Sequence, residues 1–245
     1  MPTALVFAAG LGTRLKPLTD TMPKAMVPVC GEPLIAHTLR RLKAAGFDRA
    51  VVNVHHFGQQ IIDFLSENDF GIEVAVSDER DCLLDTGGGL RKAAPLLTAK
   101  EPAAPILIHN VDILSNADLP AFRDAAQEND VTLLVSRRDT KRYLLFDADN
   151  RLCGWTNIET GEVRTPYPAL DVSTCKRLAF SGLHVVSPKI FALMQAYPAR
   201  FPIMDFYLEQ CDKLQIRAYE QPGLQLIDVG KLDPLAKAEE FLKNK

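Results

Sequence analysis

The sequence lacks the segments and charge that would suggest a membrane, an export route or nucleic acid. Its apolar runs are all shorter than the ~20 residues that a membrane-spanning helix requires. No basic segment precedes the short apolar stretch at the N-terminus, as a secretory signal peptide would need. The net charge of −3 offers no overall attraction for nucleic acid or an anionic membrane. We therefore expect a cytoplasmic protein that binds neither nucleic acid nor membrane.

The number and spacing of the cysteines argue against a disulfide framework and against a structural zinc site. The five cysteines are an odd number and form no Cys-x-x-Cys pair: Cys30, Cys82, Cys153, Cys175 and Cys211. No cluster of cysteine and histidine has the spacing of a structural zinc site. Reduced thiols in a cytoplasmic protein are the expected state.

The patterns that are present alternate between strand and helix. The chain has 245 residues, of which 47% are hydrophobic and 24% charged, as is typical of a globular protein. Apolar runs or helical periodicity predict, in order, a strand, a helix, a strand, a helix and a strand at 3–9, 33–45, 49–54, 58–66 and 71–77. This order predicts a Rossmann-like α/β fold with a mixed, mostly parallel sheet and helices on both faces. Ligands of such sheets bind at the carboxyl ends of the strands.

The first predicted strand leads directly into a glycine-containing loop. Gly10 and Gly12 allow the backbone to turn sharply and to bring its N–H groups close to a ligand. Arg14 and Lys24 add positive charge, and two prolines stiffen the loop between them. A long cationic loop after a buried strand suits a nucleoside triphosphate.

Two common glycine motifs do not match this loop. A dinucleotide-binding fingerprint needs a third glycine, but the chain has Leu15 at that position. It also needs an acidic residue at the end of the second strand, where the chain has His55 and His56. A P-loop needs Gly-Lys-Ser/Thr, but the chain reads Leu15-Lys16-Pro17. The remaining alternative from the residues alone is a plain turn.

The loop contains a longer pattern. Gly10 to Thr19 reads Gly-x-Gly-Thr-Arg-x-x-Pro-x-Thr, and this run is followed by Pro23-Lys24 and by Pro28. This pattern resembles the signature of the sugar-1-phosphate nucleotidyltransferases. The resemblance implies that the loop holds the nucleoside triphosphate and that its arginine and lysine neutralise the phosphates and the departing pyrophosphate. The residues predicted to bind nucleotide here are Ala9, Gly10, Gly12, Thr13, Arg14 and Lys24.

A second glycine-rich segment, Asp85 to Gly89, precedes a predicted helix at 90–97. Three glycines before a helix N-terminus permit close approach of the backbone and offer N–H donors. A flexible hinge with a helix cap is the alternative. The resemblance implies contacts with the base and ribose from Thr86, Gly87 and Gly88, and Thr-Gly-Gly-Gly is similar to the N-acetylmuramate-1-phosphate uridylyltransferases within the family.

Two aspartates follow strands that we expect to end at one edge of the sheet. Asp112 follows a strand at 105–109, and Asp228 follows a short strand at 224–227 and precedes an amphipathic helix at 231–242. The resemblance implies that both hold Mg²⁺, which takes one or two carboxylates together with substrate phosphates. Val111 stands where the family often has glycine. An Asx turn for Asp112 and a helix cap for Asp228 are the alternatives.

The segment at about 140–182 is predicted to be a small antiparallel insertion near the sugar site. A hairpin is expected at 144–155, and the basic cluster at 137–142 is interpreted as a solvated loop. The Glu-Lys-Pro motif that many family members use for the sugar phosphate is absent, and Glu159 and Lys176 are the candidates to replace it. Phe180-Ser181-Gly182 resembles a sugar-pocket strand. The predicted sugar-binding residues are Asn110, Ser181 and Gly182.

These observations predict one nucleotidyltransferase domain over 1–245. It would use Mg²⁺ and make an NDP-sugar and pyrophosphate from a nucleoside triphosphate and a sugar-1-phosphate, with Arg14, Lys24 and Asp112 as catalytic residues. UTP and N-acetylmuramate-1-phosphate are the predicted substrates, which implies a step of peptidoglycan recycling. Guanylyl transfer to mannose-1-phosphate or a heptose phosphate is the first alternative, and a non-catalytic nucleotide-sugar sensor is the second. The sequence leaves the oligomeric state open.

Overall fold

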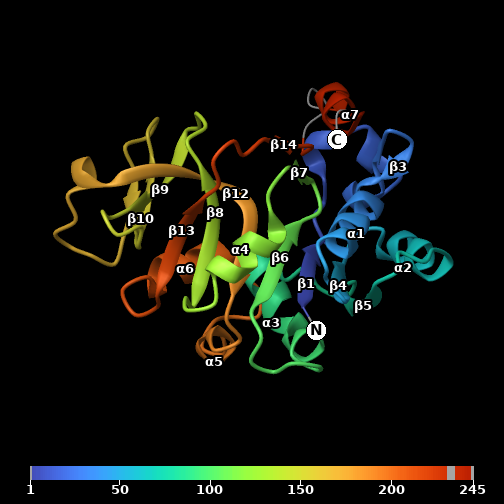
Figure 1. The fold of residues 1–245 in the computed structure, drawn as a ribbon, viewed down its shortest axis with the longest axis horizontal. Helices are drawn as coiled ribbons and strands as arrows, with labels where there is room; N and C mark the ends of the chain where they lie inside the picture. Colours follow the sequence, from blue (N-terminus) through green and yellow to red (C-terminus); the bar gives the residue numbers. More distant parts are fainter. Residues whose placement is uncertain (1, 231–234, 244–245) are drawn as a thin grey trace.

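The computed structural model describes residues 2–230 and 235–243. Its main feature is a sheet of ten strands in which β12 joins two differently built halves (Figure 1). The order along the main path is β11-β10-β9-β12-β6-β1-β4-β5, while β8 pairs with β12 and with β13. The strand bounds are β1 Thr3–Phe7, β4 Arg49–Val54, β5 Glu73–Asp78, β6 Ile106–Asn110, β8 Val131–Ser136, β9 Arg142–Phe146, β10 Leu152–Asn157, β11 Val163–Arg164, β12 Lys176–Val186 and β13 Ile216–Glu220.

The half that contains β1 is parallel throughout. β1 pairs in parallel with β4 on one side and β6 on the other, and β4 pairs in parallel with β5. Helical crossovers link these strands: α1 Leu34–Ala44, α2 Gly58–Glu67 and α3 Asp85–Leu97. The parallel strands with their helical crossovers, joined to an antiparallel half, form the predicted Rossmann-like, mixed sheet.

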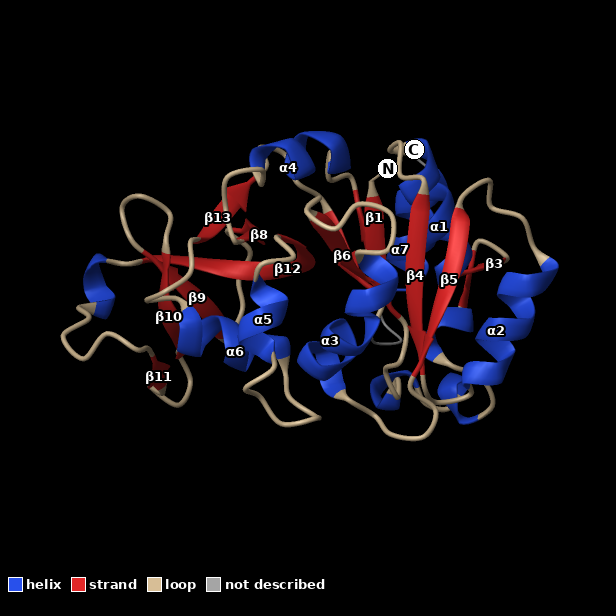
Figure 2. Ribbon diagram, turned by 90° about the horizontal axis from the view of Figure 1, so that it is seen from below, coloured by secondary structure: helices blue, strands red, loops and turns tan. Residues whose placement is uncertain are grey.

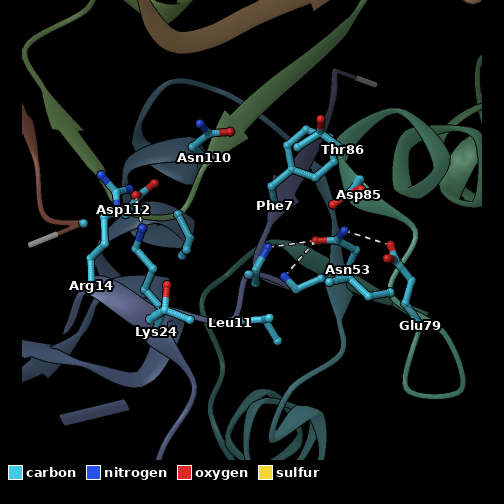
Figure 3. A pocket seen from close by; sticks show the side chains of 18 of the residues that line it. Phe7, Leu11, Arg14, Lys24, Asn53, Glu79, Asp85, Thr86, Asn110 and Asp112 are labelled. Atoms are coloured by element: carbon cyan, nitrogen blue, oxygen red, sulfur yellow. Dashed lines mark hydrogen bonds and ion pairs between the residues drawn. The ribbon is translucent and has the colours of Figure 1, made fainter. Parts of the chain in front are cut away.

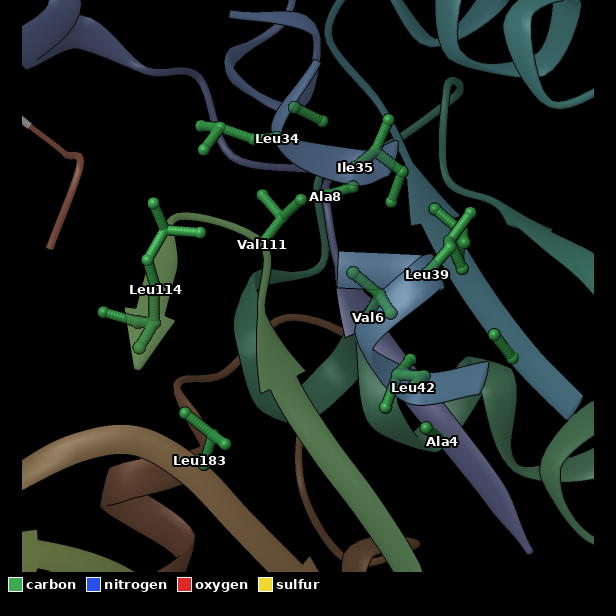
Figure 4. Packing of buried hydrophobic residues seen from close by; sticks show 14 of the residues in the cluster. Ala4, Val6, Ala8, Leu34, Ile35, Leu39, Leu42, Val111, Leu114 and Leu183 are labelled. Carbon is green, nitrogen blue, oxygen red and sulfur yellow. The ribbon is translucent and has the colours of Figure 1, made fainter. Parts of the chain in front are cut away.

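Buried side chains on alternate positions of β1 explain why helices cover both faces. Ala4 and Val6 join a core cluster with the apolar face of α1 (Figure 4), whereas Leu5 joins a second cluster with α3. A strand that is covered on both faces carries apolar residues at successive positions. The first cluster also takes in α2, α4 Leu119–Ala125 and α7 Leu235–Lys243, and the second takes in α5 Ile190–Met194 and α6 Ile203–Gln210.

The other half of the sheet is mainly antiparallel. β12 pairs antiparallel with β6, β8 and β9, and β9, β10 and β11 follow one another as an antiparallel meander (Figure 2). This meander lies within the insertion predicted at about 140–182. The expected hairpin is present as β9 and β10, and α6 packs against β10.

The register of the parallel strands gathers their following loops at one edge. Phe7 at the end of β1 is paired with Asn53 on β4 and with Asn110 on β6, and Val54 is paired with Asp78 on β5. The segments that leave these strands therefore start side by side. This edge carries the glycine loop and the first of the two predicted metal-binding aspartates.

Two small antiparallel sheets complete the fold. β7 Ile113–Ser115 pairs with β14 Leu226–Asp228, and β2 Pro28–Val29 pairs with β3 Glu32–Pro33. The glycine loop continues through three short 3-10 turns: Thr13–Leu15, Leu18–Asp20 and Lys24–Met26. No helix in the described part of the chain is long and apolar enough to cross a membrane.

The start of α3 differs from the sequence-based expectation. α3 begins at Asp85 rather than at residue 90, so the three glycines lie within its first turns. The final helix is described from Leu235, and the first four residues of its predicted span, 231–234, lie outside the described residues.

Candidate active site

A cavity of about 450 Å³ opens at the carboxyl edge of the parallel strands. Its lining comes from the end of β1 and the glycine loop, from β4, from the segment between β5 and α3, and from the end of β6. Figure 3 shows two groups of polar side chains in it: Arg14, Lys24 and Asp112 lie together, apart from Asn53 and Glu79. The cavity thus has a charged end and an end built on buried polar groups.

The glycine loop is folded back on itself at Gly12. This residue has a φ of +64°, and a Cβ atom there would lie 2.7 Å from Cγ2 of Thr19. The buried Thr19 hydroxyl donates a hydrogen bond of 2.8 Å to the Gly12 carbonyl oxygen. Within the described chain the N–H groups of Gly10, Leu11 and Gly12 have no protein acceptor. Unpaired backbone N–H groups beside a cavity suit an anion such as phosphate.

Asn53 fixes the start of this loop. Its side-chain oxygen accepts hydrogen bonds from the N–H groups of Ala8, at 2.7 Å, and Ala9, at 3.3 Å. Its amide nitrogen donates to Oε1 of Glu79 at 2.8 Å. Ala9 lines the cavity, but its N–H group already donates to Asn53, and its contact with a nucleotide stays a prediction.

Glu79 is a buried carboxyl group at the same end of the cavity. Its side chain is fully buried, and Oε2 has no hydrogen-bond partner among the described residues. Burial raises the pKa of Glu79, and the hydrogen bond from Asn53 opposes this shift only in part. Sequence reasoning missed both residues. The available signal was an acidic residue just beyond the carboxyl end of the third strand.

The charged end of the cavity is organised by Lys24 and Asp112. Lys24 Nζ and Asp112 Oδ2 form an ion pair in which each side chain is 13% exposed. Arg14, Lys24, Asp112 and Gly230 all line the cavity. Val111, which precedes Asp112, is buried in the same core cluster as Leu114 and Leu183 (Figure 4).

The second predicted metal-binding aspartate lies beside the first. β14 pairs antiparallel with β7 so that Asp228 faces Ile113, and Val229 N donates to the Asp112 carbonyl oxygen at 2.8 Å. A Cβ atom on Gly230 would lie 2.6 Å from Asp228 Oδ1, 2.9 Å from Arg14 Nη2 and 3.2 Å from Asp112 Oδ2. The two carboxylates and the guanidinium group therefore surround one glycine.

The two carboxylates have the chemistry of ligands for a hard divalent cation. Two adjacent carboxylates beside a cavity suit Mg²⁺, which takes its remaining ligands from substrate phosphates and water. Among the described residues, no group of three or more His, Cys, Asp or Glu side chains could hold a metal ion, so an ion here would need ligands from the substrate and water.

The Thr-Gly-Gly-Gly segment is placed differently from the expectation. Thr86 lines the cavity, and its Oγ1 accepts a hydrogen bond of 2.9 Å from Ile203 N. The N–H groups of Gly87 and Gly88 donate to the Phe201 carbonyl oxygen, so they are not free donors for a ligand. A Cβ atom on Gly87 would lie 2.3 Å from the Phe201 ring. A Cβ atom on Gly88 would lie 2.3 Å from the Ala199 carbonyl oxygen. Close helix packing is the physical reason for these glycines.

The three predicted sugar-binding residues lie near one another, but only one lines the cavity. Gly182 has a φ of +78°, and a Cβ there would lie 2.7 Å from Ile113 and 3.2 Å from Nδ2 of Asn110, which lines the cavity. Gly182 lies within an irregularity in the pairing of β12 with β8. Ser181 is buried, and its hydroxyl has no partner among the described residues.

The two candidates to replace the missing Glu-Lys-Pro motif are engaged elsewhere. Lys176 Nζ donates to the Ala148 carbonyl oxygen and to Asn150 Oδ1, and Glu159 forms an ion pair with Lys141. Neither lines the cavity at the strand ends. Sequence reasoning also missed several lining residues, because it had no sequence signal for them: Phe7, Leu11, Leu83, Asp85 and Arg200.

Comparisons with known proteins identify the family. The nucleotidyl transferase family profile matches residues 3–154. An N-acetylmuramate alpha-1-phosphate uridylyltransferase from Neisseria meningitidis serogroup B is 43% identical over 195 residues, which is 79% of this chain and 78% of that protein. A protein of the same name from Caulobacter vibrioides is 34% identical over 202 residues, covering 77% of this chain and 76% of its own.

The fold agrees with solved structures of more distant proteins. A putative glucose-1-phosphate thymidylyltransferase from Bacillus anthracis has a TM-score of 0.80 at 16% identity, covering 100% of this chain and 96% of its own. With a profile match over more than half of its length and a relative that is 43% identical, the chain belongs to the nucleotidyl transferase family, as a sugar-1-phosphate nucleotidyltransferase.

Proposed function

We propose that this enzyme transfers a uridylyl group from UTP to N-acetylmuramate α-1-phosphate, forming UDP-N-acetylmuramate and pyrophosphate. The choice of substrate rests on the two relatives of that name, which match more than three quarters of the chain. The assignment of the active site rests on one observation above all: Arg14, Asp112 and Asp228 converge around Gly230 at the charged end of the cavity.

The two ends of the cavity suggest how the nucleotide lies. Phosphates would lie against the unpaired N–H groups of the glycine loop, within reach of Arg14 and Lys24. The uridine would extend toward Thr86 and the Asn53–Glu79 pair. Because Asn53 holds the start of the loop, the donors are in position before the nucleotide binds, which lowers the cost of ordering them.

The reaction needs no protein nucleophile. An oxygen of the sugar phosphate attacks the α-phosphorus of UTP, a new P–O bond forms, and the bond from the α-phosphorus to the pyrophosphate oxygen breaks. The protein aligns the two reactants and neutralises the charge that they bring together. Arg14 would stabilise the departing pyrophosphate, and Lys24 the α-phosphate or the sugar phosphate. Asp112 and Asp228 would hold Mg²⁺, which supplies further neutralisation of the phosphates.

The test is pyrophosphate release across a grid of nucleotides and sugar-1-phosphates in the presence of Mg²⁺. The grid includes UTP with N-acetylmuramate-1-phosphate, and GTP with mannose-1-phosphate and with a heptose phosphate. The proposal expects the first combination to give the highest kcat/KM. A higher value for a guanylyl combination would assign the enzyme to that reaction. A grid without turnover, from folded protein that binds nucleotide, would favour a nucleotide-sugar sensor.

A further inference from the structure

A second cavity, of about 280 Å³, lies in the antiparallel half of the molecule. The loop between β8 and β9, the sheet strands β9, β10 and β12, and the start of α6 supply its walls. These elements lie together on one side of the molecule (Figures 1 and 2). We call this space the side cavity.

Two short segments connect the wall of the side cavity to the wall of the main cavity. Its wall residue Phe180 is followed by Ser181 and then Gly182, which abuts Asn110 of the main cavity. Its wall residue Met204 follows Ile203, whose N–H group donates to Thr86 of the main cavity. A sugar with its phosphate near Asp112 would therefore extend past Asn110 toward the side cavity.

The floor of the side cavity is apolar and aromatic. Leu144 on β9 is paired with Trp155 on β10 and with Leu178 on β12, and Phe180 lies two residues beyond Leu178 on the same strand. Paired residues and residues two apart share a face of the sheet. Trp155 and Phe180 are only partly buried. Apolar and aromatic walls with few polar groups are typical of small-molecule sites.

Two arginines line the side cavity beside its apolar floor, and neither has an acidic partner among the described residues. The basic cluster predicted to be a solvated loop divides in two: Arg137 pairs with Glu220 and Lys141 pairs with Glu159, whereas Arg138 and Arg142 line the side cavity. Among the described residues neither Arg138 nor Arg142 forms an ion pair.

The position of Arg138 is further defined by its own contacts. Its Nη2 donates a hydrogen bond of 3.0 Å to the Phe180 carbonyl oxygen, which holds the guanidinium group against β12. The loop that carries it is tied by a hydrogen bond of 3.1 Å from Thr140 N to Tyr143 Oη. A guanidinium group has five N–H donors in a planar fork, so Arg138 retains donors that match a carboxylate.

We propose that Arg138, with Arg142 beside it, binds a carboxylate group of the acceptor sugar. The inference rests on the proposed function, because N-acetylmuramate carries such a group on its lactyl ether whereas N-acetylglucosamine does not. Arg138 is thereby a residue that determines substrate specificity, and it takes no part in the transfer of the uridylyl group.

The experiment compares N-acetylmuramate-1-phosphate with the analogue in which the lactyl carboxylate is a carboxamide. With UTP, the wild-type enzyme is expected to prefer the carboxylate substrate about ten- to a hundredfold in kcat/KM, as for one or two charge-assisted hydrogen bonds. Arg138→Gln should remove most of this preference by slowing only the carboxylate substrate. Arg138→Lys should keep part of it, and Arg142→Gln should have a smaller effect in the same direction.

Arg137→Gln is the matched control, because it removes a neighbouring cation that is already paired with Glu220. It should leave both rates unchanged. Equal use of the two substrates by the wild type, an equal loss of both rates in Arg138→Gln, or a loss confined to Arg142→Gln would each overturn the assignment to Arg138. Failure of the wild type to use N-acetylmuramate-1-phosphate with any nucleotide would instead contradict the proposed function.

Discussion

Lys24 and Asp112 form an ion pair although 88 residues separate them in the sequence. The pair joins the last turn of the glycine loop to the end of β6, and both side chains are largely buried. A buried carboxylate without a partner is costly, so Lys24 satisfies Asp112 in the ligand-free enzyme. In the proposed reaction the same lysine would pair with phosphate oxygens of the substrates.

The first prediction concerns Asp112. Asp112→Asn keeps the size of the side chain but removes the charge that would hold Mg²⁺ and that pairs with Lys24. We expect kcat to fall at least about a hundredfold while the fold is retained. Pyrophosphate release with saturating substrates measures the rate, and circular dichroism checks the fold. Asp149→Asn, at an exposed turn, is the control. Wild-type turnover in Asp112→Asn would reject the metal assignment.

The second prediction concerns Gly230. In Gly230→Ala the new methyl group would lie 2.6 Å from Asp228 Oδ1 and 2.9 Å from Arg14 Nη2, so at least one of these groups must move. We expect kcat/KM to fall about tenfold or more and the Mg²⁺ concentration for half-maximal rate to rise, because misplaced charges neutralise the phosphates less well.

Gly223→Ala provides the comparison for this variant. That glycine also lies in a turn, with a φ of +68°, but nothing lies within 4 Å of a Cβ atom there. It should lower stability by ~1 kcal/mol and leave the Mg²⁺ dependence unchanged. The same Mg²⁺ dependence in both variants and the wild type would show that Gly230 has no special relation to the carboxylates.

The third prediction concerns the raised pKa of Glu79. A carboxyl group with a higher pKa in the folded state binds protons more tightly when folded, so the free energy of unfolding falls as the pH rises through the window above its ordinary pKa of 4.5. Glu79→Gln can still accept the hydrogen bond from Asn53 but carries no charge. We expect this variant to be more stable than the wild type at neutral pH, with a gap that narrows toward pH 4.5. Urea unfolding at several pH values measures the gap, and a gap independent of pH would contradict the prediction.

The fourth prediction concerns His184, which is buried on β12. Burial lowers its pKa from 6.5 to about 3, and its Nδ1 lies 3.2 Å from Tyr207 Oη. The unfolded chain therefore binds a proton below pH 6.5 that the folded chain does not, and stability falls as the pH drops from 6.5 toward 3. The loss from this group should reach ~2 kcal/mol at pH 5.

His184→Asn tests this prediction because asparagine is polar and does not titrate. The variant should lose less stability than the wild type between pH 7 and pH 5, even if it is less stable at neutral pH. Chemical unfolding at the two pH values gives the comparison. Parallel losses in both proteins would assign the acid sensitivity to other groups.

Local patterns were sufficient to predict the parallel half of the fold. The strand at 49–54 was predicted from its apolar run with the bounds that the structure has, and its six successive buried residues agree with a strand covered on both faces. Arg14, Lys24 and Asp112 could be assigned to one site because strand ends in a parallel sheet share an edge. Their roles in binding stay predictions.

The features that sequence reasoning missed depend on contacts between distant residues. The start of α3 was wrong because glycine is a poor helix former, whereas here Gly87 and Gly88 are required by the close approach of Phe201 and its loop. The Asn53–Glu79 hydrogen bond depends on the relative positions of two strands. The division of the basic cluster depends on the ion pair between Arg137 and Glu220, which are 83 residues apart.

The position of β14 has a consequence for the order in which the enzyme is made. Asp228 and Gly230 are translated after the whole sheet and after the loop that carries Arg14, yet they complete the charged end of the cavity. A nascent chain that has emerged from the ribosome only to a point before β14 contains the glycine loop and Asp112 but lacks the second carboxylate. If both carboxylates act as proposed, the reaction would begin only after synthesis has passed this strand, and chains terminated before it would be inactive rather than partly active.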